Sequence, residues 1–137
     1  MDRQQQLALL VDHAKNPRHR EAMQDADVAM PGGSPECGGS VGMYLKGEGD
    51  SRIEAVSFTG QGDTISMAAT SLLMEFVYDE DLKMDEVLAL DYDDFVGRVG
   101  REVVGSRTRN ATLGLSALKS VVRKYRKDRQ LSRASTG

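Results

Sequence analysis

Hydrophobic residues recur along the chain with two different periods, which predict both helices and strands. Leu7, Leu10, Val11 and Ala14 follow helical spacing. This pattern stops before Pro17, because proline disfavours helix in the residue that precedes it. We therefore expect a first helix over about 4–15. A second helical face is predicted over about 64–78, and its apolar members are Ile65, Ala69, Leu72, Leu73, Phe76 and Val77.

Between these two helices the period changes to that of a strand. Val41, Met43 and Leu45 alternate with small or polar residues, and a second run rich in branched and aromatic side chains covers 52–59. Glycines between the two runs predict a β-hairpin. Residues 25–30 could add an edge strand, limited in length by Pro31. We expect most of 18–39 to be a long irregular loop.

The remaining residues predict further helices. Short helical patterns cover 83–90 and 93–100, and a polar stretch with glycines follows over 100–109. A final helix is expected to begin near Ala111, with Lys119, Arg123 and Lys124 facing solvent and with Leu115, Leu118, Val121, Val122 and Tyr125 as its apolar positions. This order predicts an α+β fold, a small antiparallel sheet of about three strands with helices packed on one face.

Length and charge indicate one domain with a basic end. The chain has 137 residues, and we assign 1–126 to a single domain and 127–137 to a basic, disordered tail. The segment 79–95 is strongly acidic, whereas 118–137 is strongly basic. A basic tail can attract acidic partners, but a solvated helix end is the favoured interpretation. Nucleic acid is not expected, because the tail lacks aromatic residues for stacking on bases.

Several function classes are disfavoured by what the sequence lacks. No apolar run approaches the ~18 residues of a membrane span, and the first residues do not resemble a signal peptide. We therefore expect a cytoplasmic protein. Cys37 is the one cysteine, so no intramolecular disulfide can form. Spacing gives no convincing set of nucleophile, base and orienting group, and catalysis is not expected.

Four segments, in the correct order, resemble motifs of the U-type iron–sulfur cluster scaffold family, which includes the IscU and SufU branches and the N-terminal domain of NifU. They are Asp12-His13 with Asn16-Pro17-Arg18, Pro35-Glu36-Cys37-Gly38-Gly39, Gly60-Gln61-Gly62-Asp63-Thr64-Ile65-Ser66, and Asn110-Ala111-Thr112-Leu113 with Ala117-Leu118. The resemblance covers most of the chain from Leu10 to Tyr125 and implies a SufE/NifU-like fold. It also implies binding of an iron–sulfur cluster or zinc, and a cysteine desulfurase as partner.

The resemblance also implies a ligand set, from which this sequence departs. The family supplies three cysteines and an aspartate. Here Cys37 stands at the first cysteine, Asp63 at the second in the SufU-like alignment, and Asn110 at the third, while Gly39 replaces the aspartate. In the IscU-like alignment Gln61 lies near the second position instead. Because clusters and zinc prefer thiolate ligands, we do not expect one chain to bind either tightly.

These positions have structural interpretations as well. Asp and Asn are favourable N-cap residues, so Asp63 and Asn110 are expected to cap helices rather than to bind metal, and His13 is expected to pack rather than to coordinate. Cys37 is either a small, partly buried residue or an accessible thiol that accepts sulfur or metal. The resemblance favours a cluster-assembly scaffold homologue with a reduced ligand set; the alternative is a metal-free binding or regulatory module with the same fold.

Overall fold

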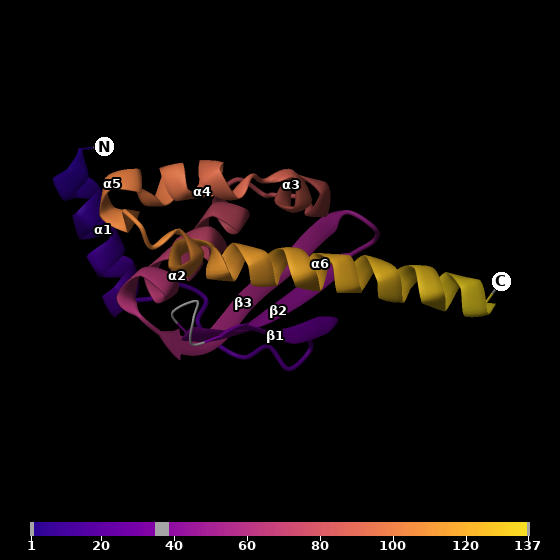
Figure 1. Ribbon diagram of the computed structural model, residues 1–137. Helices are drawn as coiled ribbons and strands as arrows, with labels where there is room; N and C mark the ends of the chain where they lie inside the picture. The colour runs from indigo at the N-terminus through magenta and orange to yellow at the C-terminus, as the bar shows by residue number, and fades with distance from the viewer. Residues whose placement is uncertain (1, 35–38, 137) are drawn as a thin grey trace.

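Three antiparallel strands form one sheet, in the order β1-β2-β3. The computed structural model describes residues 2–34 and 39–136 (Figure 1). The strands are β1 (Val28–Ser34), β2 (Gly39–Glu48) and β3 (Arg52–Gly62), and helices lie on one face of the sheet (Figure 1). The predicted α+β class and the three-stranded sheet are confirmed.

The central strand β2 has the alternation that its sequence predicts. Val41, Met43 and Leu45 are at most 2% exposed, and they point toward the helices because successive side chains of a strand face opposite sides. On β3 the large apolar side chains Val56 and Phe58 join the same core. The predicted hairpin is thus confirmed.

The edge strand β1 is longer and begins later than the sequence suggested. It continues through Pro31 and the following glycines as far as Ser34, which pairs with Gly39, so part of the expected loop is strand. An ideal Cβ added at Gly32 would lie 3.1 Å from the Cβ of Ala117. Glycine therefore lets the last helix approach the strand closely. This contact between distant segments explains why the glycines lie in a strand, which local propensity does not predict.

Six helices are found in the described part of the chain: α1 (Arg3–Lys15), α2 (Thr64–Asp79), α3 (Met84–Ala89), α4 (Tyr92–Val99), α5 (Arg101–Val104) and α6 (Thr108–Thr136). Figure 1 shows α6 running over the sheet, with α3 and α4 on its far side. Helix α1 packs against α2, and α2 packs against α6. The last pair is tight, because a Cβ at Gly114 would lie 2.4 Å from Thr70 Oγ1.

Lys119 was expected to face solvent, and this prediction is wrong. The residue is 6% exposed, and its Nζ donates to the carbonyl oxygen of Leu88 at 3.1 Å and also to that of Leu90. Burial lowers the pKa of the Lys119 ammonium from its usual value. The α3 end supplies acceptors that a helical pattern within α6 could not reveal.

Helix α6 also differs from its expected limits. It begins at Thr108 rather than near Ala111, and it continues to Thr136 through most of the segment expected to be disordered. Arg129 donates to Asp50 Oδ1 at 2.9 Å, and Arg133 donates to the same oxygen. These contacts with the β2–β3 turn give the basic end of the helix partners within the fold.

Candidate functional site

The N-terminal ends of α2 and α6 meet over one end of the sheet (Figure 1). Strand β3 ends at Gly62, and Asp63 follows directly as the N-cap of α2. Gly39, the first residue of β2, pairs with Gly62 on one side and with Ser34 on the other. The fold therefore brings Ser34, Gly39, Asp63 and the start of α6 to the same region.

Asp63 is a helix cap, as the sequence predicted. Its Oδ1 accepts a hydrogen bond from the backbone N–H of Ser66 at 2.7 Å, which satisfies one of the amides that a helix start leaves without a partner. Its Oδ2 accepts a hydrogen bond from Asn110 Nδ2. Both carboxylate oxygens are thus occupied by donors of the protein.

Asn110 is not an N-cap, and that prediction is wrong. It is the third residue of α6, because the helix has already started when Ala111 N–H donates to the Arg107 carbonyl at 3.0 Å. Its side chain instead bonds to Asp63, a residue 47 positions earlier. No local signal predicts this pair; only the family alignment placed the two residues at one site.

Gly39 has a backbone conformation that excludes the family's aspartate. Its φ is +154°, and an ideal Cβ would lie 2.5 Å from Gln61 O and 2.5 Å from Gly62 Cα. Both contacts are with backbone, which cannot rotate away. The loss of the carboxylate is therefore coupled to the way in which β2 begins beside β3, and an aspartate here would require the strand ends to move.

Cys37 lies outside the described residues, so its predicted role stays a prediction. The described chain stops at Ser34 and resumes at Gly39, both paired in the sheet. Cys37 is two positions from Gly39 in the sequence. Gln61, the alternative candidate for the second ligand, is an exposed residue of β3 paired with Ser40.

The site has one further polar group that the sequence did not single out. Ser66, in the first turn of α2, is fully buried, and its Oγ has no hydrogen-bond partner among the described residues. The first turns of α2 and α6 also place their positive dipole ends here. Such a setting favours negative charge and would lower the pKa of a nearby thiol.

His13 is not brought to this site. It is completely buried, and its Nδ1 lies 2.7 Å from Ser71 Oγ, which also accepts the backbone N–H of Arg18 at 2.7 Å. Ser71 is about 12 Å along α2 from Asp63, at 1.5 Å per residue. Burial lowers the pKa of His13 from its usual 6.5. The expectation that His13 packs is confirmed.

Membrane-spanning segments are not found in the described part of the chain, where no helix is both long and apolar enough to cross a bilayer.

Comparisons with known proteins agree with this arrangement. Residues 6–132 match the family described as NifU-like N terminal domain. The zinc-dependent sulfurtransferase SufU of Bacillus subtilis is 28% identical over 131 residues, which cover 85% of this chain and 88% of that protein. The iron–sulfur cluster assembly scaffold protein IscU of Streptococcus pyogenes is 33% identical over 84 residues, covering 61% of this chain and 50% of that protein.

A solved structure described only as that of a hypothetical protein superposes with a TM-score of 0.71 at 25% identity, covering 88% of this chain and 98% of that one. The name of the Bacillus relative refers to an activity, so the expectation that this chain is not an enzyme stays a prediction. The family match spans nearly the whole chain, and the fold and the four motifs agree with it. The chain belongs to the NifU-like N-terminal domain family, that of the U-type scaffolds.

Proposed function

We propose that this protein takes part in iron–sulfur cluster assembly as a scaffold homologue that does not hold a cluster or zinc by itself. The observation that carries the proposal is the hydrogen bond between Asn110 and Asp63. The two residues stand where the resemblance to the family implies cysteines. The fold brings them together, and the side-chain amide of Asn110 donates a hydrogen bond to the carboxylate of Asp63. The contact between these two aligned positions supports the proposal, because neither of them supplies a thiolate.

The donor set does not fit a thiolate-bound metal. Zinc and iron–sulfur clusters in this kind of site need about four soft donors. The chain offers one thiol, one carboxylate that already accepts two hydrogen bonds, and one amide. Gly39 cannot become the fourth donor without a backbone shift. Protein side chains of one chain therefore do not complete the site.

Metal analysis tests this part of the proposal. Protein purified without added metal is expected to contain substoichiometric zinc or iron and to show no stable cluster absorbance after anaerobic reconstitution. Two chains together would supply only two thiolates, so dimerisation does not change the expectation. A stable product with one cluster per chain at neutral pH would contradict it.

Cys37 is proposed as the working residue, accepting sulfur from a cysteine desulfurase. In this step the Cys37 thiolate attacks the outer sulfur of the desulfurase persulfide; a new S–S bond forms on Cys37, the old S–S bond breaks, and the desulfurase leaves as a thiolate. No net oxidation or reduction occurs. The positive ends of α2 and α6 at this region support a thiolate. A cytoplasmic location, where thiols stay reduced, is part of the same proposal.

Intact-protein mass spectrometry tests the sulfur transfer. Incubation with a cysteine desulfurase and cysteine should add the mass of one sulfur atom, removable by a thiol reductant, and Cys37→Ser should abolish the addition. Ser116→Ala, a substitution at an exposed position of α6 that keeps the cysteine, serves as the control. The role assigned to Cys37 would be refuted if the parent and the control variant both failed to gain the mass of a sulfur atom.

A metal-free binding or regulatory module is the second candidate. The Asp63–Asn110 hydrogen bond also favours it, because the two side chains satisfy each other without a metal ion. The two candidates differ in one measurement. A regulatory module would bind the desulfurase and change its turnover equally well with Cys37→Ser. A sulfur acceptor would lose its effect on turnover with that variant.

A further inference from the structure

A buried histidine connects α1 to α2 outside the candidate site. His13 is completely buried, and so is its hydrogen-bond partner Ser71. The chain has two histidines, and the other one, His19, is exposed. Ser71 is excluded as a nucleophile, because a fully buried hydroxyl is not accessible to a substrate. The pair therefore acts within the protein, on the segment that it holds.

Ser71 Oγ takes part in two hydrogen bonds. It lies 2.7 Å from His13 Nδ1, and it accepts the backbone N–H of Arg18 at 2.7 Å. A hydroxyl carries one proton, so Ser71 can donate that proton to His13 while it accepts from Arg18. The hydrogen-bond network thus assigns the proton of the neutral ring to Nε2, which lies 3.9 Å from Glu75 Oε1. This tautomer places an N–H, rather than a lone pair, beside the carboxylate.

Arg18 belongs to the segment 16–20, which follows α1 and lies along the outer edge of β3. The sheet ends at β3, so the backbone groups on its outer side need partners from elsewhere. The segment supplies two of them. The carbonyl of His19 accepts the N–H of Phe58 at 3.0 Å, and the side chain of the last residue of the segment donates to Gly60 O at 2.6 Å. The N–H of Arg18 therefore fastens to α2 a segment that covers the edge of β3.

Three charged side chains act on the His13 ring: Asp12 of the same helix, Glu75 of α2 and Arg18 of the segment. Arg18 contacts both carboxylates, because its Nε lies 3.3 Å from Glu75 Oε2 and its Nη2 donates to Asp12 at 2.6 Å. Burial, together with the Arg18 guanidinium, lowers the pKa of His13 against the opposing effect of the two carboxylates. The ring is therefore neutral at neutral pH.

Protonation of the ring disturbs these contacts in two ways. With protons on both ring nitrogens, Nδ1 becomes a donor, and the Ser71 hydroxyl loses the acceptor of its own proton. The charged ring also repels the Arg18 guanidinium and competes with it for Glu75. Both effects act on the residue that fastens the segment.

We propose that this network of His13, Ser71 and Arg18 is an acid-sensitive latch. It holds the segment 16–20 on the edge of β3 while His13 is neutral, and it releases the segment when His13 takes up a proton from solvent. Release leaves the outer backbone groups of β3 without their partners, shortly before the strand ends at the candidate site. The open form binds one proton that the closed form excludes, so the opening equilibrium depends on pH.

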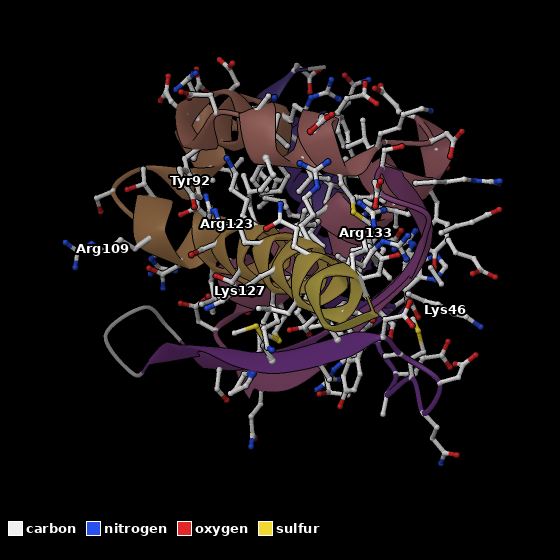
Figure 2. The ribbon with its side chains drawn as sticks, turned by 90° about the vertical axis from the view of Figure 1, so that its right-hand side faces the viewer. Lys46, Tyr92, Arg109, Arg123, Lys127 and Arg133 are labelled. Carbon is white, nitrogen blue, oxygen red and sulfur yellow. The ribbon has the colours of Figure 1, made fainter. Side chains whose placement is uncertain are left out.

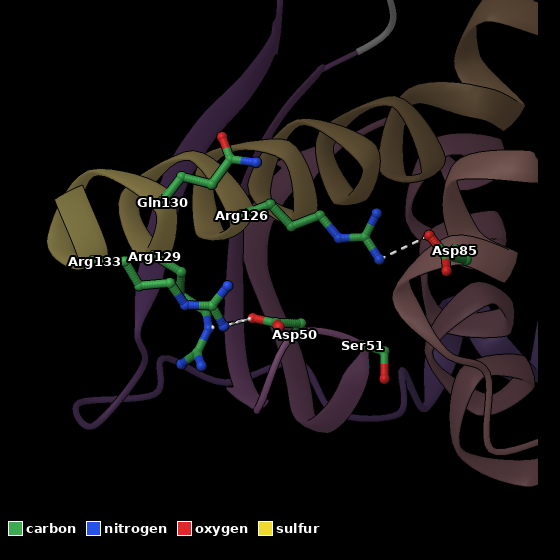
Figure 3. Close-up of a pocket in the computed structure, with 7 residues that line it drawn as sticks. All are labelled: Asp50, Ser51, Asp85, Arg126, Arg129, Gln130 and Arg133. Carbon is green, nitrogen blue, oxygen red and sulfur yellow. Dashed lines mark hydrogen bonds and ion pairs between the residues drawn. The ribbon is translucent and has the colours of Figure 1, made fainter. Parts of the chain in front are cut away.

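The charged clusters elsewhere in the molecule do not change their charge in the same way. Figure 3 shows the arginines of α6 with Asp50; Arg133 and Arg129 hold the pKa of this carboxyl at about 2, and arginine stays protonated. Figure 2 shows further cations at the surface, among them Arg109 and Lys127. Histidine is the side chain that ordinarily titrates between about pH 5 and 8, so a response in this range indicates one of the two histidines.

Amide hydrogen exchange of the full chain, followed by NMR between about pH 7.5 and about pH 5, tests this proposal. The protection factors of the Arg18 and Phe58 amides, corrected for the intrinsic pH dependence of exchange, report opening of the segment. Both should stay constant above about pH 6.5 and fall below it by up to about tenfold per pH unit, because opening takes up one proton. Core amides of α6 should stay better protected at each pH, which separates release of the segment from global unfolding.

A matched pair of substitutions assigns the response to one histidine. His13→Asn places an amide oxygen close to the position of Nδ1, where it can accept the Ser71 proton, and it does not titrate. The pH response should therefore disappear while protection at neutral pH is kept. His19→Asn makes the same change at the exposed histidine, whose φ of +59° asparagine tolerates, and the response should persist. Ser71→Ala removes the acceptor of the Arg18 N–H and should lower the protection of that amide several-fold already at neutral pH.

Three outcomes would overturn the proposal: constant protection of Arg18 and Phe58 across this pH range, the same response in His13→Asn as in the parent, or loss of the response in His19→Asn. Glu75→Gln keeps the test decisive if His13→Asn does not fold. It removes a carboxylate that raises the pKa of His13, so the closed form tolerates the charged ring less and the total fall in protection should be larger. An equal or smaller fall would contradict the latch.

Discussion

Replacing Asp63 and Asn110 together by cysteine should rebuild a zinc site in this protein. The two side chains are in hydrogen-bond contact, through atoms one bond further out than a cysteine sulfur. Two sulfurs would therefore lie further apart than the present atoms, as required for ligands of one tetrahedral zinc, which are about 3.8 Å apart. Cys37 would supply a third thiolate. Gly39 should be kept, because its backbone does not accept a side chain.

The magnitudes favour a net gain when zinc is present. Loss of the Asp63 cap costs about 0.5–2 kcal/mol, and loss of the Asn110 hydrogen bond costs about 0.5–1.5 kcal/mol. Zinc at a thousandfold excess over its dissociation constant stabilises the folded state by about 4 kcal/mol. Without metal the double variant should melt below the parent; with zinc its melting temperature should rise on the order of 10 °C.

Differential scanning calorimetry with zinc and with a chelator measures this response. The parent should respond little, and Cys37→Ser in the double variant should lose much of the response. If the double variant folds, yet melts at the same temperature with zinc as with chelator, the alignment of Asp63 and Asn110 with ligand positions is wrong.

The other predictions concern packing and burial. Gly114→Ala should destabilise the protein by about 1–3 kcal/mol in urea unfolding, because its Cβ would lie 2.4 Å from Thr70 Oγ1; Thr70→Ala should recover part of the loss. Lys119→Met should cost about 1–3 kcal/mol by leaving two buried carbonyls without a donor, a loss that Lys119→Arg should reduce. His13 has a folded-state pKa below 6.5, so the unfolded chain binds the proton first as pH falls. The free energy of unfolding should then decrease as pH drops below about 6.5, and His13→Gln should flatten that slope; an unchanged slope would contradict the burial argument.

The sequence predicts well those elements whose signals are local. The alternation through Val41, Met43 and Leu45 predicts β2 because one face of a strand is buried, and the apolar face around Leu73 predicts α2 for the same reason at helical period. Asp63 was predicted as a cap because a carboxylate directly before a helical run can accept a hydrogen bond from the N–H groups of the first turn. These features depend on neighbours in the chain.

The features that were missed depend on distant partners. Gly32 belongs to a strand because Ala117 packs against it, and Lys119 is buried because α3 ends beside it with free carbonyls. Asn110 bonds to a residue on another helix. The start of α6 was placed too late because residues 108–110 carry no apolar side chain, and the periodicity therefore gives no sign of helix there.

Helix α6 sets the spacing between the two polar regions of the molecule. Asn110 stands near its beginning and Arg126 sixteen residues later, a separation of about 24 Å along a straight helix. A small partner domain that covers one end therefore leaves the other end accessible. Two partners that approach opposite ends of α6 would therefore not touch each other, and the helix would fix the distance between them.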